Sequence, residues 1–184
     1  MKRPVKSGVR SSRGPRINRT PSRAIAMSVP WLSVAFASLV SVVLIIASTP
    51  LVPPLGFLMF IAWRQLRPGL MPVWAGLPLG LIDDIFSGQP VGSAVLLWSL
   101  AAIALDVVEA RLPWRNFLTE WLLAAGMAAT YIILALVLAN IAGAATPVWV
   151  IMPQVAISIL LYPLVGRLVA LLDRARLVPF LEAR

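Results

Sequence analysis

Long apolar stretches alternate along the chain with short groups of charged residues. Four runs without any charged side chain are 40, 15, 21 and 46 residues long, at positions 24–63, 68–82, 85–105 and 121–166. A helix that crosses a bilayer needs about 20 predominantly apolar residues, so the first and last runs each hold two helices. The pattern therefore predicts six membrane-spanning helices, at residues 29–49, 53–66, 70–87, 91–109, 117–141 and 147–172.

The positions of the basic residues predict the orientation of these helices. All 16 Lys and Arg residues fall within 2–23, 64–67, 111–115 and 167–184, which are the two termini and every second connection of a six-helix chain, together with the adjoining parts of the helices. Positive charge marks the cytoplasmic side of membrane proteins. With 60% hydrophobic and 12% charged residues, the chain is predicted to be an all-α polytopic membrane protein with both termini in the cytoplasm.

The predicted domain organisation has three parts. Residues 1–27 carry eight basic and no acidic residues and cannot bury enough apolar surface to fold alone, so we expect a disordered cytoplasmic arm. Residues 28–173 form the transmembrane domain, and 174–184 a short cytoplasmic tail. The arm is expected to contact anionic lipid. Nucleic-acid binding is the alternative, but the arm has no aromatic residue to stack on bases, and we expect none.

Proline and tryptophan suggest where helices bend and where they meet the membrane surface. Pro53 begins the second predicted helix, which ends in Trp63, Arg67 and Pro68, an aromatic and basic collar suited to the head-group level. Pro163 lies inside the last predicted helix and predicts a kink or a break there.

One stretch places two adjacent carboxylates in apolar sequence between regularly spaced glycines. Gly76, Gly80, Asp84 and Gly88 recur at every fourth position and therefore share one face of a helix, and Gly92 continues the spacing. A face without side chains lets another helix approach closely, so these residues are predicted to pack helices or to bind a partner. An acid in such a place is a candidate functional residue.

The composition argues against catalysis and metal binding. The chain has no Cys and no His, so the commonest metal ligands and general bases are missing. Asp83 and Asp84 point about 100° apart on a helix, and Ser87 and Gly88 supply no second acid one turn on. We therefore expect a protein that is not an enzyme and that has no metal or cofactor.

The string Gly80-x-x-x-Asp84-x-x-x-Gly88-x-x-x-Gly92 resembles the signature of the MreD family of rod shape-determining membrane proteins. Pro53, Trp63 and Arg67-Pro68 before it, and Leu161-Tyr162-Pro163 after it, fit the same family. The family usually has an apolar residue where this chain has Asp83, so the resemblance extends to Asp84 alone.

The resemblance implies a non-catalytic subunit of the elongasome in the bacterial inner membrane. It implies direct contact with MreC, and a shared complex with MreB, RodA and a class B penicillin-binding protein that positions lateral peptidoglycan synthesis. The family is also similar in fold to the substrate-binding S components of energy-coupling-factor transporters, which is the alternative function. Asp84 then has two possible roles. It either accepts amide hydrogen bonds or caps a helix within the fold, or it contacts MreC or a lipid-linked ligand.

Overall fold

The residues that the structure describes fold into a bundle of six α-helices. A computed structural model describes residues 23–46, 52–111 and 116–177, and no β-strand occurs among them. Residues 1–22, most of the predicted basic arm, lie outside the described residues. The elements are α1 (Arg23–Ile46), α2 (Leu55–Leu66), the 3-10 turn η1 (Val73–Ala75), α3 (Gly76–Ser87), α4 (Ser93–Arg111), α5 (Phe117–Ile141), the 3-10 turn η2 (Val148–Ile151) and α6 (Met152–Arg176).

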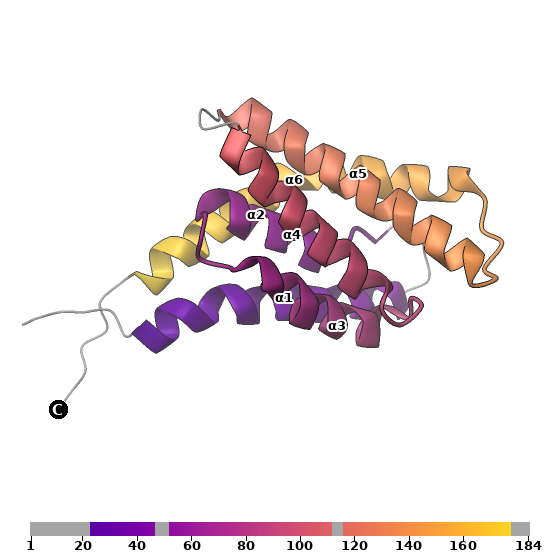
Figure 1. The fold of residues 1–184 in the computed structure, drawn as a ribbon, viewed down its shortest axis with the longest axis horizontal. Helices are drawn as coiled ribbons and strands as arrows, with labels where there is room; N and C mark the ends of the chain where they lie inside the picture. The colour runs from indigo at the N-terminus through magenta and orange to yellow at the C-terminus, as the bar shows by residue number, and fades with distance from the viewer. Residues whose placement is uncertain (1–22, 47–51, 112–115, 178–184) are drawn as a thin grey trace, which may run out of the picture.

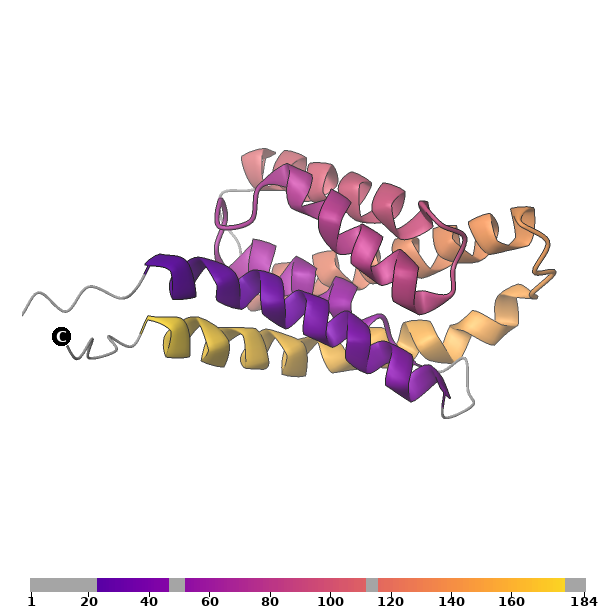
Figure 2. The ribbon, with the colours of Figure 1, turned by 90° about the horizontal axis from the view of Figure 1, so that it is seen from below.

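Successive helices run in opposite directions along the bundle (Figure 1). α1 and α5 begin at the same end at which α2, α4 and α6 finish, and seen from below α1 and α6 lie along one side of the molecule (Figure 2). We call this end the basic end, because it carries Arg64, Arg67, Arg111, Arg174 and Arg176. The opposite end carries the α3–α4 turn and the α5–α6 connection, and we call it the turn end.

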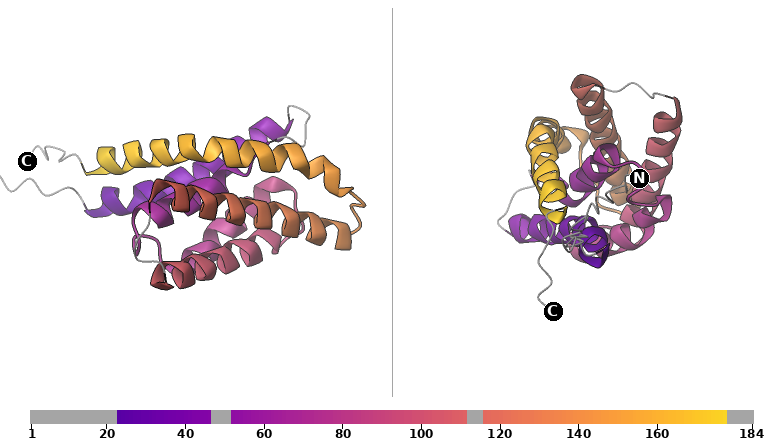
Figure 3. Two further views of the ribbon diagram at one scale, coloured as in Figure 1. Left: turned by 90° about the horizontal axis from the view of Figure 1, so that it is seen from above. Right: turned by 90° about the vertical axis from the view of Figure 1, so that its left-hand side faces the viewer.

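The short helix α2 lies in the middle of the bundle. Seen end-on, the other helices surround it (Figure 3), and every residue from Gly56 to Gln65 is buried. A helix that is apolar all round is typical of such a central position. At 1.5 Å per residue its 12 residues span about 18 Å, less than the hydrocarbon thickness of a bilayer. A helix shorter than the bilayer is tolerated at this position because it contacts protein, rather than lipid, on all sides.

The outer surface of the bundle is apolar. Three helices within the described residues are long and apolar enough to cross a membrane: Ser93–Arg111, Phe117–Ile141 and the continuous segment Val148–Arg176. Leu160, Leu164, Leu168 and Leu171 form an exposed stripe along α6. Apolar surface of this extent is suited to lipid contact, as expected for a membrane protein.

The prediction of a third helix over 70–87 is wrong for residues 70–75. The chain instead turns through η1, and α3 begins only at Gly76. Pro72 precedes η1 in an extended conformation, and Pro78 lies in the first turn of α3, where no amide donor is needed.

The first and last helices extend beyond the predicted boundaries of the transmembrane domain. α1 already begins at Arg23 and α6 continues to Arg176, so residues 23–27 of the predicted arm and 174–176 of the predicted tail are helical. The fifth predicted helix, 117–141, matches α5 at both ends.

Candidate functional site

The carboxylate of Asp84 binds the first turn of the next helix. Asp84 lies near the end of α3, and its side chain is almost fully buried, with 3% of the residue exposed. It accepts hydrogen bonds from the backbone amides of Gly92 (2.9 Å), Ala94 (2.8 Å) and Val95 (3.2 Å), and from the Ser93 hydroxyl (3.2 Å). Because the first amides of a helix lack intrahelical partners, Asp84 caps α4 from a neighbouring helix.

The glycine face of α3 is occupied by α4. A Cβ added to Gly76 would lie 2.8 Å from the backbone of Trp98, and one added to Gly80 would lie 2.8 Å from the backbone of Ala94 and Val95. Neither glycine can be replaced without moving the two helices apart. The face therefore packs α3 against α4 within the chain, and it is not open to a partner's helix.

Gly88 and Gly92 do not belong to this packing face. Both have a positive φ, +68° at Gly88 and +95° at Gly92, and a Cβ on either would meet nothing within 4 Å. Gly88 ends α3 in the left-handed conformation that favours glycine, and Gly92 turns the chain into α4. The prediction that Gly88 shares the helix face of Gly76, Gly80 and Asp84 is thus wrong, and Gly92, which continues the spacing in the sequence, lies in the turn. They shape the turn that brings the α4 amides to Asp84.

The neighbouring carboxylate, Asp83, points to another part of the bundle. It is 9% exposed, and its Oδ2 accepts a hydrogen bond from the Tyr131 hydroxyl of α5 at 3.2 Å. Tyr131 in turn stacks on Phe57 of the central helix, with ring centroids 4.2 Å apart. Within the described residues neither Asp83 nor Asp84 has an ion-pair partner, and no group of three acidic, His or Cys side chains could hold a metal ion.

A buried arginine joins the central helix to α4 at the basic end. The guanidinium of Arg64 is 4% exposed and donates to the carbonyls of Met71 (2.6 Å) and Ala102 (3.2 Å), and it also forms an ion pair with Asp106. These three contacts hold the loop before η1 and the middle of α4 against α2. Arg64 is therefore structural, although its position in the sequence predicts only a surface charge.

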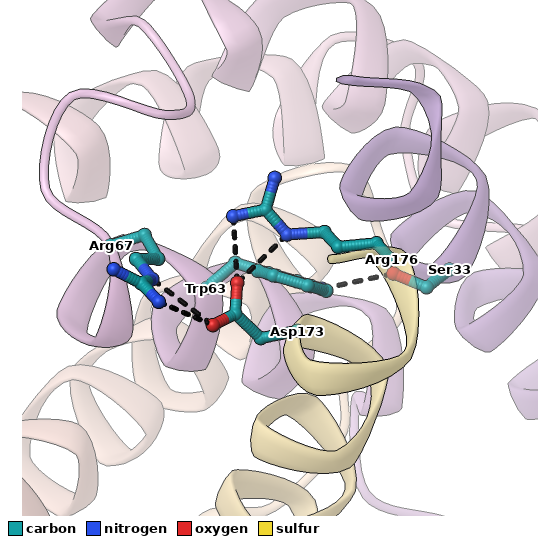
Figure 4. A network of polar contacts seen from close by, with 5 residues as sticks. All are labelled: Ser33, Trp63, Arg67, Asp173 and Arg176. Carbon is teal, nitrogen blue, oxygen red and sulfur yellow. Dashed lines mark hydrogen bonds and ion pairs between the residues drawn. The ribbon is translucent and has the colours of Figure 1, made fainter. Parts of the chain in front are cut away.

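A second ionic network joins α1, α2 and α6 (Figure 4). Asp173 binds Arg67 through Oδ2 at 2.9 Å and Arg176 through Oδ1 at 2.7 Å. The hydrogen bond to Asp173, and then the negative charge of that carboxylate, raise the pKa of Arg67. The Arg176 guanidinium lies 5.6 Å from the ring centre of Trp63, whose Nε1 donates to the Ser33 hydroxyl at 2.9 Å.

The predicted structural residues have different roles in the fold. Trp63 is fully buried, so its interpretation as part of a membrane-surface collar is wrong. Pro53 precedes α2, and exposed Pro68 follows it. Pro163 lies within α6, which continues through it. Because proline lacks an amide hydrogen, it leaves the carbonyl of Ile159 without its helical partner, and the Nε1 of Trp121 donates to that oxygen at 2.9 Å.

Three residues that matter in the fold were not singled out from the sequence: Arg64, Tyr131 and Asp173. The available signal for Arg64 was the apolar sequence on every face of its helix, which is typical of a buried helix. Nothing in the spacing identified Tyr131, since the hydrogen bond to Asp83 joins positions 48 residues apart.

Comparisons with protein-family models, with curated proteins and with solved structures found no match to this chain.

Proposed function

We propose that the chain is a non-catalytic, MreD-like subunit of the bacterial cell-shape complex. It lies in the inner membrane with six helices across the bilayer and both termini in the cytoplasm, and it partners MreC. In this complex it helps to position lateral peptidoglycan synthesis together with MreB, RodA and a class B penicillin-binding protein.

One observation carries the proposal: the residues of the resemblance string form one structural unit. Gly80 permits the close approach of α3 and α4, Asp84 caps α4, and Gly88 and Gly92 form the turn between them. The string thus has a physical role that requires this order and spacing.

The charge distribution supports the proposed orientation. Every Lys or Arg within the described residues lies at the basic end or, for Arg167, in the half of α6 that leads to it. A bundle with this asymmetry inserts with its basic end in the cytoplasm. The proposed topology then places Asp84 and the α3–α4 turn on the outer side.

Co-purification with the MreC homologue of the same genome tests the proposal. The full chain with an affinity tag, co-expressed with that homologue and extracted in mild detergent, is expected to retain it through size-exclusion chromatography. A tagged transporter of similar size serves as the control for non-specific association of membrane proteins. Recovery of well-folded protein without the MreC homologue would contradict the proposal.

A pocket at the turn end favours a second candidate, the substrate-binding component of a transporter. The pocket has a volume of about 180 Å³, and its polar side chains are Gln89, Tyr131 and Gln154. A substrate bound there would be reached from the outer side in the proposed orientation. Co-purification of an energy-coupling ATPase module in place of the MreC homologue would favour this second function.

A further inference from the structure

A pocket between α2, α5 and α6 opens in the half of the bundle nearer the basic end. Its volume is about 230 Å³. Much of its wall is apolar or aromatic, including Leu66, Phe117, Trp121, Pro163, Gly166 and Ala170. Neither the glycine string nor the ionic network of Figure 4 contributes a residue to it.

Local sequence features explain why this space exists. Gly166 faces an opening, since a Cβ added there would meet nothing within 4 Å. Pro163 lies one turn earlier on the same helix and leaves the Ile159 carbonyl free to accept a hydrogen bond from Trp121. This hydrogen bond holds α5 against α6 beside the pocket. The pocket is therefore built into the packing of α5 on α6.

The pocket carries one carboxylate and one guanidinium that do not bind each other. Glu120 of α5 and Arg167 of α6 both line it. Neither side chain has an ion-pair or hydrogen-bond partner among the described residues.

The neutral polar groups of the pocket are already paired. The Tyr162 hydroxyl donates to Gln65 Oε1 at 2.6 Å, and Gln65 Nε2 donates to the backbone oxygen of Glu120 at 3.3 Å. What the pocket offers a ligand is thus a separated pair of opposite charges beside an apolar wall.

We propose that this pocket binds the head group of a zwitterionic phospholipid that carries a primary ammonium and a phosphate. The ammonium binds Glu120, the phosphate binds Arg167, and the start of an acyl chain lies along the apolar wall. Arginine suits phosphate because its planar donors bind two oxygens at once.

The charge and the size of the pocket both favour this ligand. One acidic and one basic side chain give the lining no net charge, so an anionic head group gains nothing from Glu120. Sites for whole drug-sized ligands occupy about 300–1,000 Å³. A volume of about 230 Å³ therefore suits a head group whose acyl chains stay in the bilayer.

The pocket also lies at a suitable depth. Glu120 is in the first turn of α5, which begins at the basic end, and Arg167 lies nine residues before the end of α6, about 13 Å along the helix. The long side chain of Arg167 can extend along α6 toward the head-group level while its stem stays against apolar surface.

Native mass spectrometry of the full chain in neutral detergent tests the proposal. The protein is titrated with phosphatidylethanolamine and, separately, with phosphatidylglycerol of identical acyl chains. We expect the first lipid molecule to bind about fivefold more tightly as phosphatidylethanolamine, the factor that about 1 kcal/mol of ionic interaction gives. Glu120→Gln should remove this preference, Arg167→Gln should weaken binding of both lipids about fivefold, and Gly166→Leu should fill the pocket and abolish tight binding.

Two matched variants serve as controls. Arg174→Gln removes an exposed charge from the same end of α6 without touching the pocket. Gly126→Leu adds the same side chain as Gly166→Leu at another helical glycine with open space around it. Both should bind phosphatidylethanolamine as the wild type does.

Three results would overturn the proposal. They are equal affinity for the two lipids, an unchanged preference in Glu120→Gln, and wild-type binding by a folded Gly166→Leu variant. If Gly166→Leu fails to fold, as judged by size-exclusion chromatography against Gly126→Leu, the Glu120→Gln titration alone decides the question.

Discussion

Replacing Asp84 by alanine tests whether this carboxylate holds the fold together. The variant loses four hydrogen bonds and leaves the amides of Gly92, Ala94 and Val95 without an acceptor. Loss of a helix cap costs about 1–2 kcal/mol, and a buried unpaired amide about 1–3 kcal/mol. Because the amides of Gly92 and Val95 are only partly buried, we count the cap and the one buried amide, that of Ala94, and expect a total loss of about 2–5 kcal/mol.

The assay is thermal unfolding of the purified chain in detergent, followed by circular dichroism. A loss of this size lowers the melting temperature by roughly 10 °C in a chain of this length. Asp84→Asn keeps one oxygen acceptor and should fall between the alanine variant and the wild type. Asp83→Asn is the matched control one residue away. It retains an acceptor for the Tyr131 hydroxyl and should change stability by no more than about 1 kcal/mol.

One result would refute this reasoning. If Asp84→Ala melted like the wild type but no longer co-purified with the MreC homologue, the carboxylate would serve the partner and not the fold. A variant that is destabilised and also loses the homologue supports the structural role, because a disrupted α3–α4 hairpin removes binding indirectly.

The same melting assay tests three further parts of the structure. Gly80→Leu should destabilise the bundle by about 1–3 kcal/mol because its side chain would collide with the α4 backbone. Gly126→Leu should not destabilise it, and equal effects of the two substitutions would contradict the close packing of α3 on α4. Arg64→Gln should cost about 3 kcal/mol of stability, since it removes a buried guanidinium that binds two carbonyls and the partly exposed Asp106. Arg67→Gln should cost less because its side chain is half exposed, and the reverse order would contradict this difference in burial. Trp121→Phe should lower the free energy of unfolding by about 1–2 kcal/mol, because it leaves the Ile159 carbonyl of α6 unpaired. An unchanged stability would mean that water replaces the indole as the donor to this carbonyl.

Helix positions could be predicted from the sequence because long apolar runs between charges admit few alternatives. The prediction for 117–141 was confirmed at both ends, since Asn116 caps α5 and supplies a local start signal. The prediction for 70–87 was wrong at its start. Its residues before Gly76 are apolar enough for a helix, but Pro72 is extended and the chain turns through η1 before α3.

The role of Asp84 could be narrowed to two alternatives from the sequence but not decided. Three of its four partners are backbone amides, which have no sequence signature. They reach the carboxylate only because Gly88 and Gly92 adopt positive φ and reverse the chain. The hydrogen bonds in the structure match the alternative in which Asp84 accepts amides within the fold.

The basic residues that the structure describes lie at or toward one end of the bundle, as their positions predict, but their buried contacts could not be predicted. The sequence predicts Trp63 at the membrane surface because it ends an apolar run, and Arg64 is the first charged residue after that run. Both are buried, since α2 is central and the surrounding helices extend beyond it. Such burial depends on which helix is surrounded by the others, and that is a property of the assembled bundle.

Depletion of the protein in a rod-shaped bacterium that encodes it tests the proposed function most directly. Cell width and length are measured by microscopy as the protein is lost. We expect cells to widen and become round, and expression of the wild-type chain or of Asp83→Asn to restore rods. Cells that remain rods of normal width after the protein has disappeared from the membrane would contradict the proposal.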